Sequence, residues 1–167
     1  MAQCLLLAIY VIVFWPTLGQ AFTADKRDTL RGLTELSVLV EYLPDDIERE
    51  GLKQDLVKQE IEGRLREAGL RVLTTAEIAK TSGAPYLYVA VYMVTGPEVS
   101  IHGYGVELVL KQLVHLSRQP ETELFATTWE GPTLPSVLNT PKVPEIRKTI
   151  SNAVQRFVID YKAMNQK

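Results

Sequence analysis

Histidine and cysteine are the residue types of this chain best suited to metal chemistry. A zinc site needs three or four His, Cys, Asp or Glu side chains at suitable spacing. The chain has two histidines, His102 and His115, and no such group accompanies either of them. Its one cysteine, Cys4, lies near the N-terminus. The sequence therefore predicts no metal site, and we expect His102 at a strand edge and His115 facing solvent or a partner.

The serines and carboxylates show no catalytic arrangement. A nucleophile needs a base and an orienting group, and none of the six serines has the strand–turn–helix setting of a G-x-S-x-G elbow. The pair Asp45-Asp46 opens a predicted helix, where the helix dipole favours negative charge without catalysis. Gly103-Tyr104-Gly105 lacks the third glycine of a dinucleotide fingerprint. We therefore expect no enzyme and no cofactor, and a hydrolase is the least favoured class.

A sheet face is the first candidate for binding. In the predicted strand Tyr86–Val94, aliphatic side chains alternate with tyrosines, so the aliphatic set should face helices and Tyr86, Tyr88 and Tyr92 should lie on the uncovered face. Val109 and Leu113 of the next strand should join them. Tyrosine combines apolar area with a polar tip and suits recognition, although such residues also make good cross-strand pairs on a solvated sheet.

A proline-rich loop is the second candidate. Gly131–Pro141 contains three prolines, which limit the entropy lost when the loop is ordered. It offers a partner three apolar anchors, Leu134, Val137 and Leu138. Folding of the loop over the sheet end would account for the same residues.

Periodicity predicts the elements that must position these residues. Strands are expected over 35–42, 70–73, 86–94, 101–116 and 124–130, and amphipathic helices over 45–68 and 146–164, with a helical turn near 75–80. Two helices can cover one face of such a sheet. The predicted fold is an α+β two-layer sandwich, with a four- to five-stranded, mainly antiparallel sheet and two amphipathic helices on one face.

Composition limits the size and the partners. The chain has 167 residues, 18 basic and 20 acidic, and a formal charge of -2, which fits one domain and offers no basic excess for nucleic acid. We therefore expect no nucleic-acid partner. Residues 22–34 are expected as a polar lead-in, and 35–167 as a single α+β domain.

The first 24 residues carry no charged side chain. Leu5–Trp15 is an apolar run, and small residues at Gly19 and Ala21 fit signal cleavage after Ala21. We expect residues 1–21 to be a signal peptide of an exported, periplasmic or secreted protein. An uncleaved anchor, if the helix continues to Ala24, would give the only membrane contact.

The order of elements from Leu36–Tyr42 through Tyr86–Leu116 to the helix Ile146–Met164 resembles small periplasmic envelope-assembly domains. Examples are the lipopolysaccharide-assembly lipoprotein and the amino-terminal domain of the Tol-system propeller protein. This chain lacks the cysteine that those lipoproteins carry after the signal. From these observations together we expect an exported, non-enzymatic binding or assembly module of the cell envelope, which acts through the sheet face and the adjoining loop on a protein partner or a second copy. The alternative is a carrier of a small molecule or lipid in a cavity between helices and sheet.

Overall fold

A computed structural model describes residues 25–95, 102–132, 134–138 and 143–166, and the expected signal peptide lies outside them. Its helices are η1 (Lys26–Leu30), α1 (Asp45–Arg49), α2 (Gln54–Glu67), α3 (Thr75–Ile78) and α4 (Val143–Asn165). Its strands are β1 (Glu35–Val40), β2 (Arg71–Val72), β3 (Tyr86–Thr95), β4 (His102–Leu116), β5 (Gln119–Glu130) and β6 (Leu134–Leu138).

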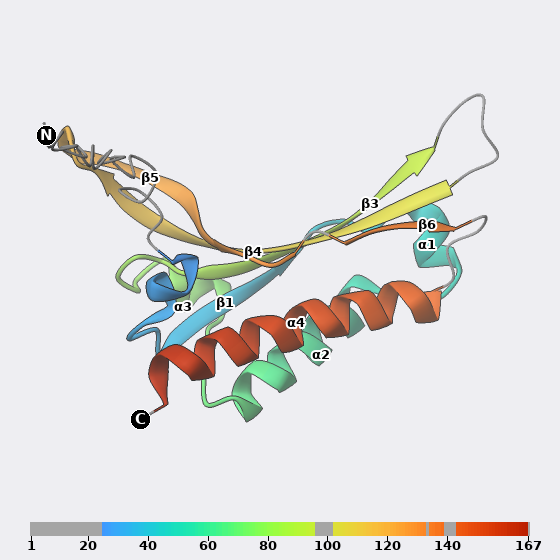
Figure 1. Ribbon diagram of the computed structural model, residues 1–167, viewed down its shortest axis with the longest axis horizontal. Coiled ribbons are helices and arrows are strands. Elements are labelled where there is room, and N and C mark those ends of the chain that lie inside the picture. Colours follow the sequence, from blue (N-terminus) through green and yellow to red (C-terminus); the bar gives the residue numbers. More distant parts are fainter. Residues whose placement is uncertain (1–24, 96–101, 133, 139–142, 167) are drawn as a thin grey trace, which may run out of the picture.

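The strands form one mixed sheet in the order β2-β1-β3-β4-β5, with β6 also paired to β4. β1 runs parallel to both β2 and β3, whereas β4 is antiparallel to β3, β5 and β6. The long helices α2 and α4 lie together on one side of this sheet (Figure 1). The structure therefore confirms the predicted two-layer α+β sandwich with a mainly antiparallel sheet.

The last strands differ from the prediction. β5 begins at Gln119, five residues ahead of the predicted start at Leu124, because the β4–β5 hairpin extends as a two-stranded arm beyond the rest of the sheet. The predicted loop Gly131–Pro141 contains β6, which continues along the same edge of β4 that β5 occupies, with Leu138 opposite His102. Pro135 is tolerated in β6 because an edge strand has one side free of ladder hydrogen bonds.

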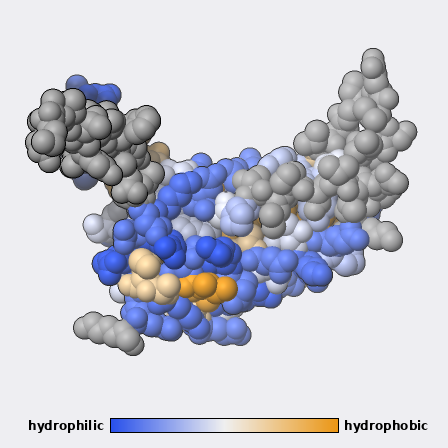
Figure 2. Space-filling model, in the orientation of Figure 1, coloured by the Kyte–Doolittle hydropathy of each residue, from blue (hydrophilic) through white to orange (hydrophobic). Residues whose placement is uncertain are grey.

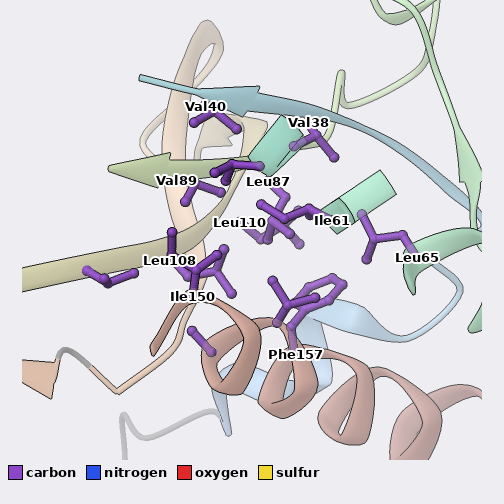
Figure 3. Close-up of a cluster of buried hydrophobic side chains, with 14 of the residues drawn as sticks. Val38, Val40, Ile61, Leu65, Leu87, Val89, Leu108, Leu110, Ile150 and Phe157 are labelled. Atoms are coloured by element: carbon purple, nitrogen blue, oxygen red, sulfur yellow. The ribbon is translucent and has the colours of Figure 1, made fainter. Parts of the chain in front are cut away.

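The core lies between sheet and helices. Leu87, Val89 and Val91 alternate inwards from β3, as their spacing predicted, and are at most 5% exposed. Leu108 and Leu110 of β4 continue this layer, and Ile61 and Leu65 of α2 and Ile150 and Phe157 of α4 meet it from the other side (Figure 3).

The predicted helix over 45–68 is two helices. Gly51 adopts a φ of 104°, in the region that favours glycine, and ends α1. The amide of Leu52 donates back to the Ile47 carbonyl (3.2 Å), and the Leu52 side chain is fully buried. The hydrophobic spacing continues across the break, so periodicity alone could not reveal it.

The predicted polar lead-in contributes to the fold. It contains η1, whose last residue Leu30 is fully buried in the core together with Leu33. Asn165 at the end of α4 fixes this segment, since its side chain donates to the Leu30 carbonyl (2.8 Å) and accepts from the Gly32 amide (2.7 Å). The described domain therefore includes residues ahead of β1.

The outer surface over α4 is largely hydrophilic, with one small apolar area (Figure 2). On α4, the side chain of Ile159 is 51% exposed. Among the described residues, no helix combines the length and the hydropathy that a membrane span requires.

Candidate functional site

Among the described residues, no element covers the sheet face opposite α2 and α4, and this uncovered face is concave because both ends of the sheet bend away from the helices (Figure 1). The strand register places the tyrosines there. Tyr86 lies opposite Lys111, Tyr88 opposite Val109, and Tyr92 opposite Gly105. The alternation that directs Leu87 and Val89 into the core thus directs these three tyrosines to the uncovered face.

Tyr88 is held by charged neighbours on both sides. Its hydroxyl donates a hydrogen bond to Oε2 of Glu41, and Nζ of Lys111 lies 4.7 Å from its ring centroid, within cation–π range. The hydrogen bond to the Glu41 carboxylate, aided by burial, raises the pKa of Tyr88 to about 12. The Tyr88 ring is therefore a neutral, positioned part of the face over the whole physiological pH range.

The other two tyrosines are also fixed by cross-strand contacts. Tyr86 meets Phe125 of β5 edge to face, with ring centroids 5.4 Å apart. The Tyr92 ring lies directly over Gly105, where a Cβ would stand 2.3 Å from the ring carbon Cζ. We call these residues, Tyr86, Tyr88, Tyr92 and Phe125, the aromatic layer.

Val109 does not lie on the surface as expected. It is 1% exposed, and Ala90 of the same face is 5% exposed, although neither belongs to the core cluster under the helices. Val109 sits between Tyr88 on β3 and Glu130 on β5, so larger neighbours cover it. At 1% exposure, Val109 is not available to a partner.

Exposed apolar area on this face comes mainly from residues that the sequence did not single out. Leu39 of β1 is 50% exposed and Phe125 is 51% exposed, compared with 41% for Tyr92. Leu113 is half-buried on the β4–β5 arm, opposite Phe125. Because side chains alternate along β1, Leu39 lies on the face opposite to that of Val38 and Val40, and this alternation could have identified Leu39 as a residue of the uncovered face.

Leu134, Val137 and Leu138 form part of β6 and lie beside Val106, Gly103 and His102 of β4. The structure therefore brings this predicted anchor segment to the sheet, at the far end of β4 from Leu113. His115 lies on the β4–β5 arm, with Nδ1 2.8 Å from the Pro120 carbonyl oxygen and Nε2 3.6 Å from Glu123. The described residues include no group of three or more side chains placed to hold a metal ion.

A pocket of ≈ 260 Å³ opens at the β1 end of this face. Its walls are mainly apolar and include Leu39, Leu73, Ile78 and Phe125, and Lys58 of α2 stands among them. The short helix α3 supplies Ile78, so this end of the face is bordered by a third helical element. Neither Leu73 nor Ile78 was predicted as a site residue, because their proximity to Phe125 depends on the tertiary fold.

No protein-family model matches this chain, and no curated protein matches it. Solved structures that are similar at low identity include two bacterial proteins. A hypothetical protein from Chlamydia trachomatis matches at 12% identity and a TM-score of 0.44, over 78% of this chain and 98% of that one. A lipoprotein from Neisseria meningitidis matches at 16% identity and a TM-score of 0.34, over 75% of this chain and 99% of that one. Neither likeness is close enough to transfer a role, and the resemblance to envelope-assembly domains stays a prediction.

Proposed function

We propose that this protein is a non-enzymatic, exported binding module that holds a protein partner on its concave sheet face. The observation that carries the proposal is the exposure of Leu39, Tyr92 and Phe125 on one uncovered face, at 50%, 41% and 51%. Aromatic residues are enriched among those that supply most of the binding energy at protein interfaces, and the buried centre of an interface is mainly apolar.

The fixed geometry of the aromatic layer supports the same proposal. Tyr88 is held by Glu41 and Lys111, and Tyr86 by Phe125, so these side chains have little rotamer freedom left to lose on binding. Preorganisation of this kind lowers the entropic cost of association. The carrier alternative gains no comparable support, since fully buried side chains such as Leu87, Leu110 and Phe157 fill the space between sheet and helices (Figure 3).

Site-specific photocrosslinking in the source organism tests the proposal. Photoreactive benzoylphenylalanine would replace Tyr92 or Phe125 on the face and, as a control, Ile159 of α4, which is as exposed as Phe125. We expect a discrete protein adduct from the two face positions and none from position 159. Mass spectrometry of the adduct then tells a second copy from another protein.

A matched pair of leucines provides the second arm. Leu39 on the face is 50% exposed and Leu56 on α2 is 46% exposed, so Leu39→Ser and Leu56→Ser remove similar exposed area. Leu39→Ser should reduce the adduct yield severalfold and Leu56→Ser should leave it unchanged. Absence of adducts at both face positions, or equal yields at all three, would overturn the proposal.

A further inference from the structure

The outer edge of β1 is paired along only part of its length. β2 contributes two residue pairs, Glu35 with Arg71 and Leu36 with Val72. Just beyond them, the Leu73 amide donates to the Leu36 carbonyl at 2.9 Å, and there the pairing stops. The chain then turns into α3 at its N-cap, Thr74. The rest of the β1 edge is therefore left without a neighbouring strand in the described part of the chain.

The hydrogen-bond pattern shows which backbone groups face that edge. In a parallel ladder the N–H and C=O of alternate residues point to the same neighbour. The Ser37 amide donates to the carbonyl of Pro85, the residue before β3 (3.0 Å), and the Glu41 amide donates to the carbonyl of Val89 in β3 (2.9 Å). The N–H and C=O groups of the intervening Val38 and Val40 consequently point outwards. Of these, the Val40 carbonyl accepts from Nε2 of Gln54 at 2.6 Å.

Val38 is the residue at which both backbone groups facing this edge are open. It is 4% exposed, and within the described residues neither its N–H nor its C=O has a hydrogen-bond partner at this edge. Buried backbone groups are almost always paired in folded proteins, because leaving them unpaired costs free energy. Val38 also lines the ≈ 260 Å³ pocket described above, so its edge opens into an apolar space.

We propose that this pocket binds an extended segment of a partner protein, which adds as a strand beside β1 in line with β2. The segment pairs its backbone with Val38, places an apolar side chain among Leu39, Ile78 and Phe125, and carries an acidic residue that reaches Lys58. This inference rests on the proposed function, since it gives the form and chemistry of part of the protein partner. Strand addition at a sheet edge is a common mode of peptide recognition, in which main-chain hydrogen bonds supply affinity and side-chain pockets supply specificity.

Charge and hydrogen bonding favour this occupant over others. Lys58 forms no ion pair among the described residues, so its ammonium group at the pocket is available to a carboxylate. A lipid chain would fill the apolar space but leave the Val38 groups unpaired. A second copy joined edge to edge about a twofold axis would bring the two Lys58 side chains to the same junction, which like-charge repulsion disfavours.

A displayed library of random heptapeptides, selected on the full chain, provides the probe. A parallel selection on the Lys58→Glu variant is the negative control, and a selection on Leu56→Ser, two residues away on the same helix, is the matched control. We expect wild type and Leu56→Ser to enrich the same peptides, with alternating apolar residues and an acidic residue, and Lys58→Glu to lose them. A synthetic copy of the best peptide is then measured by fluorescence polarisation. Its affinity should fall at least about tenfold with Lys58→Glu and recover when the peptide's acidic residue is exchanged for lysine.

Two readouts report the backbone pairing itself. Amide hydrogen exchange at Val38 should slow at least about tenfold when the peptide binds, since a ladder hydrogen bond protects the amide. A peptide N-methylated at the paired residue should lose binding. The inference would be overturned by a lack of enrichment relative to the Lys58→Glu selection, by unchanged hydrogen exchange at Val38, or by full binding of the N-methylated peptide.

The outcomes separate this inference from the proposed function. Crosslinks at Tyr92 and Phe125 without peptide binding at the edge would remove the strand-addition site and keep the face. Because Phe125 also lines the pocket, Tyr92 is the position that reports on the face alone, and peptide binding with no crosslink at Tyr92 would remove the proposed face and keep the edge as a peptide site.

Discussion

Gly105→Ala tests whether the aromatic layer is built as described. Gly105 is buried on β4 beneath the Tyr92 ring, and a Cβ there would stand 2.3 Å from Cζ and 2.6 Å from the hydroxyl oxygen of Tyr92. Non-bonded carbon atoms do not approach so closely in proteins. The Tyr92 ring must therefore swing away from the sheet when alanine replaces this glycine.

The size of the effect follows from what the ring covers. Tyr92 is 41% exposed, so most of its side chain is in contact with the sheet. Uncovering on the order of 100 Å² of aromatic and sheet surface costs about 2.5 kcal/mol at ~25 cal/mol per Å². Alanine is more favourable than glycine inside a strand by roughly 0.5–1 kcal/mol, which offsets part of this cost. We expect Gly105→Ala to lower the free energy of unfolding by about 1.5–2 kcal/mol.

The assay is urea unfolding of a double-mutant cycle with Tyr92→Ala. Once the ring is absent, Gly105→Ala should stabilise the protein by roughly 0.5–1 kcal/mol, so the sign of its effect reverses. Gly63→Ala on α2 is the control, because a Cβ at Gly63 meets nothing within 4 Å, and its effect should be the same with and without Tyr92. An equal destabilisation by Gly105→Ala in both backgrounds would refute the placement of the Tyr92 ring.

Three further predictions concern titration, burial and backbone conformation. The pKa of Tyr88 is raised from 10.0 to about 12, so the stability that this group contributes is complete below pH 10 and lost as the pH rises through about 12. Glu41→Gln should bring the pKa of Tyr88 back towards 10, and a titration of tyrosinate absorbance measures this change. Asp160→Ala should lower the free energy of unfolding by about 1–3 kcal/mol, because the buried Asp160 carboxylate accepts a hydrogen bond from Nε1 of Trp129 at 3.2 Å. Asp160→Asn should lower it less, and urea unfolding followed by tryptophan fluorescence compares the two variants. Gly51→Ala should lower the free energy of unfolding by about 1–3 kcal/mol, because φ is 104° at this position. The thermal unfolding midpoint should fall, and an unchanged midpoint would contradict that conformation.

The sequence predicted the elements whose side chains repeat with a regular period. The alternation through Leu87, Val89 and Val91 indicated both the strand β3 and its inner face, since a half-buried strand requires that period. The long helix α4 was recognisable from its apolar stripe for the same reason. The break at Gly51 was missed because a turn that preserves the hydrophobic spacing leaves no trace in it.

Features that depend on neighbouring strands could not be predicted from the hydrophobic periodicity of the sequence. β6 contains Pro135, which argues against a strand until the segment is known to lie at a sheet edge. Val109 has the position of a surface residue in its own strand, yet it is 1% exposed between its cross-strand neighbours Tyr88 and Glu130. The outer elements of the face were therefore less predictable than its central strand.

The open edge at Val38 illustrates the limit most directly. Local sequence determines which side chains of β1 face the core, but the pairing of its edge depends on where β2 stops. β2 stops early because Thr74 caps α3 with a reciprocal capping box, in which Thr74 Oγ1 accepts from the Glu77 amide and Glu77 Oε2 accepts from the Thr74 amide. A helix start that satisfies its own amides competes with further strand pairing. The capping box thus leaves Val38 open beside Phe125, a residue shared by the pocket and the aromatic layer, so a strand bound at the edge would meet the exposed face directly.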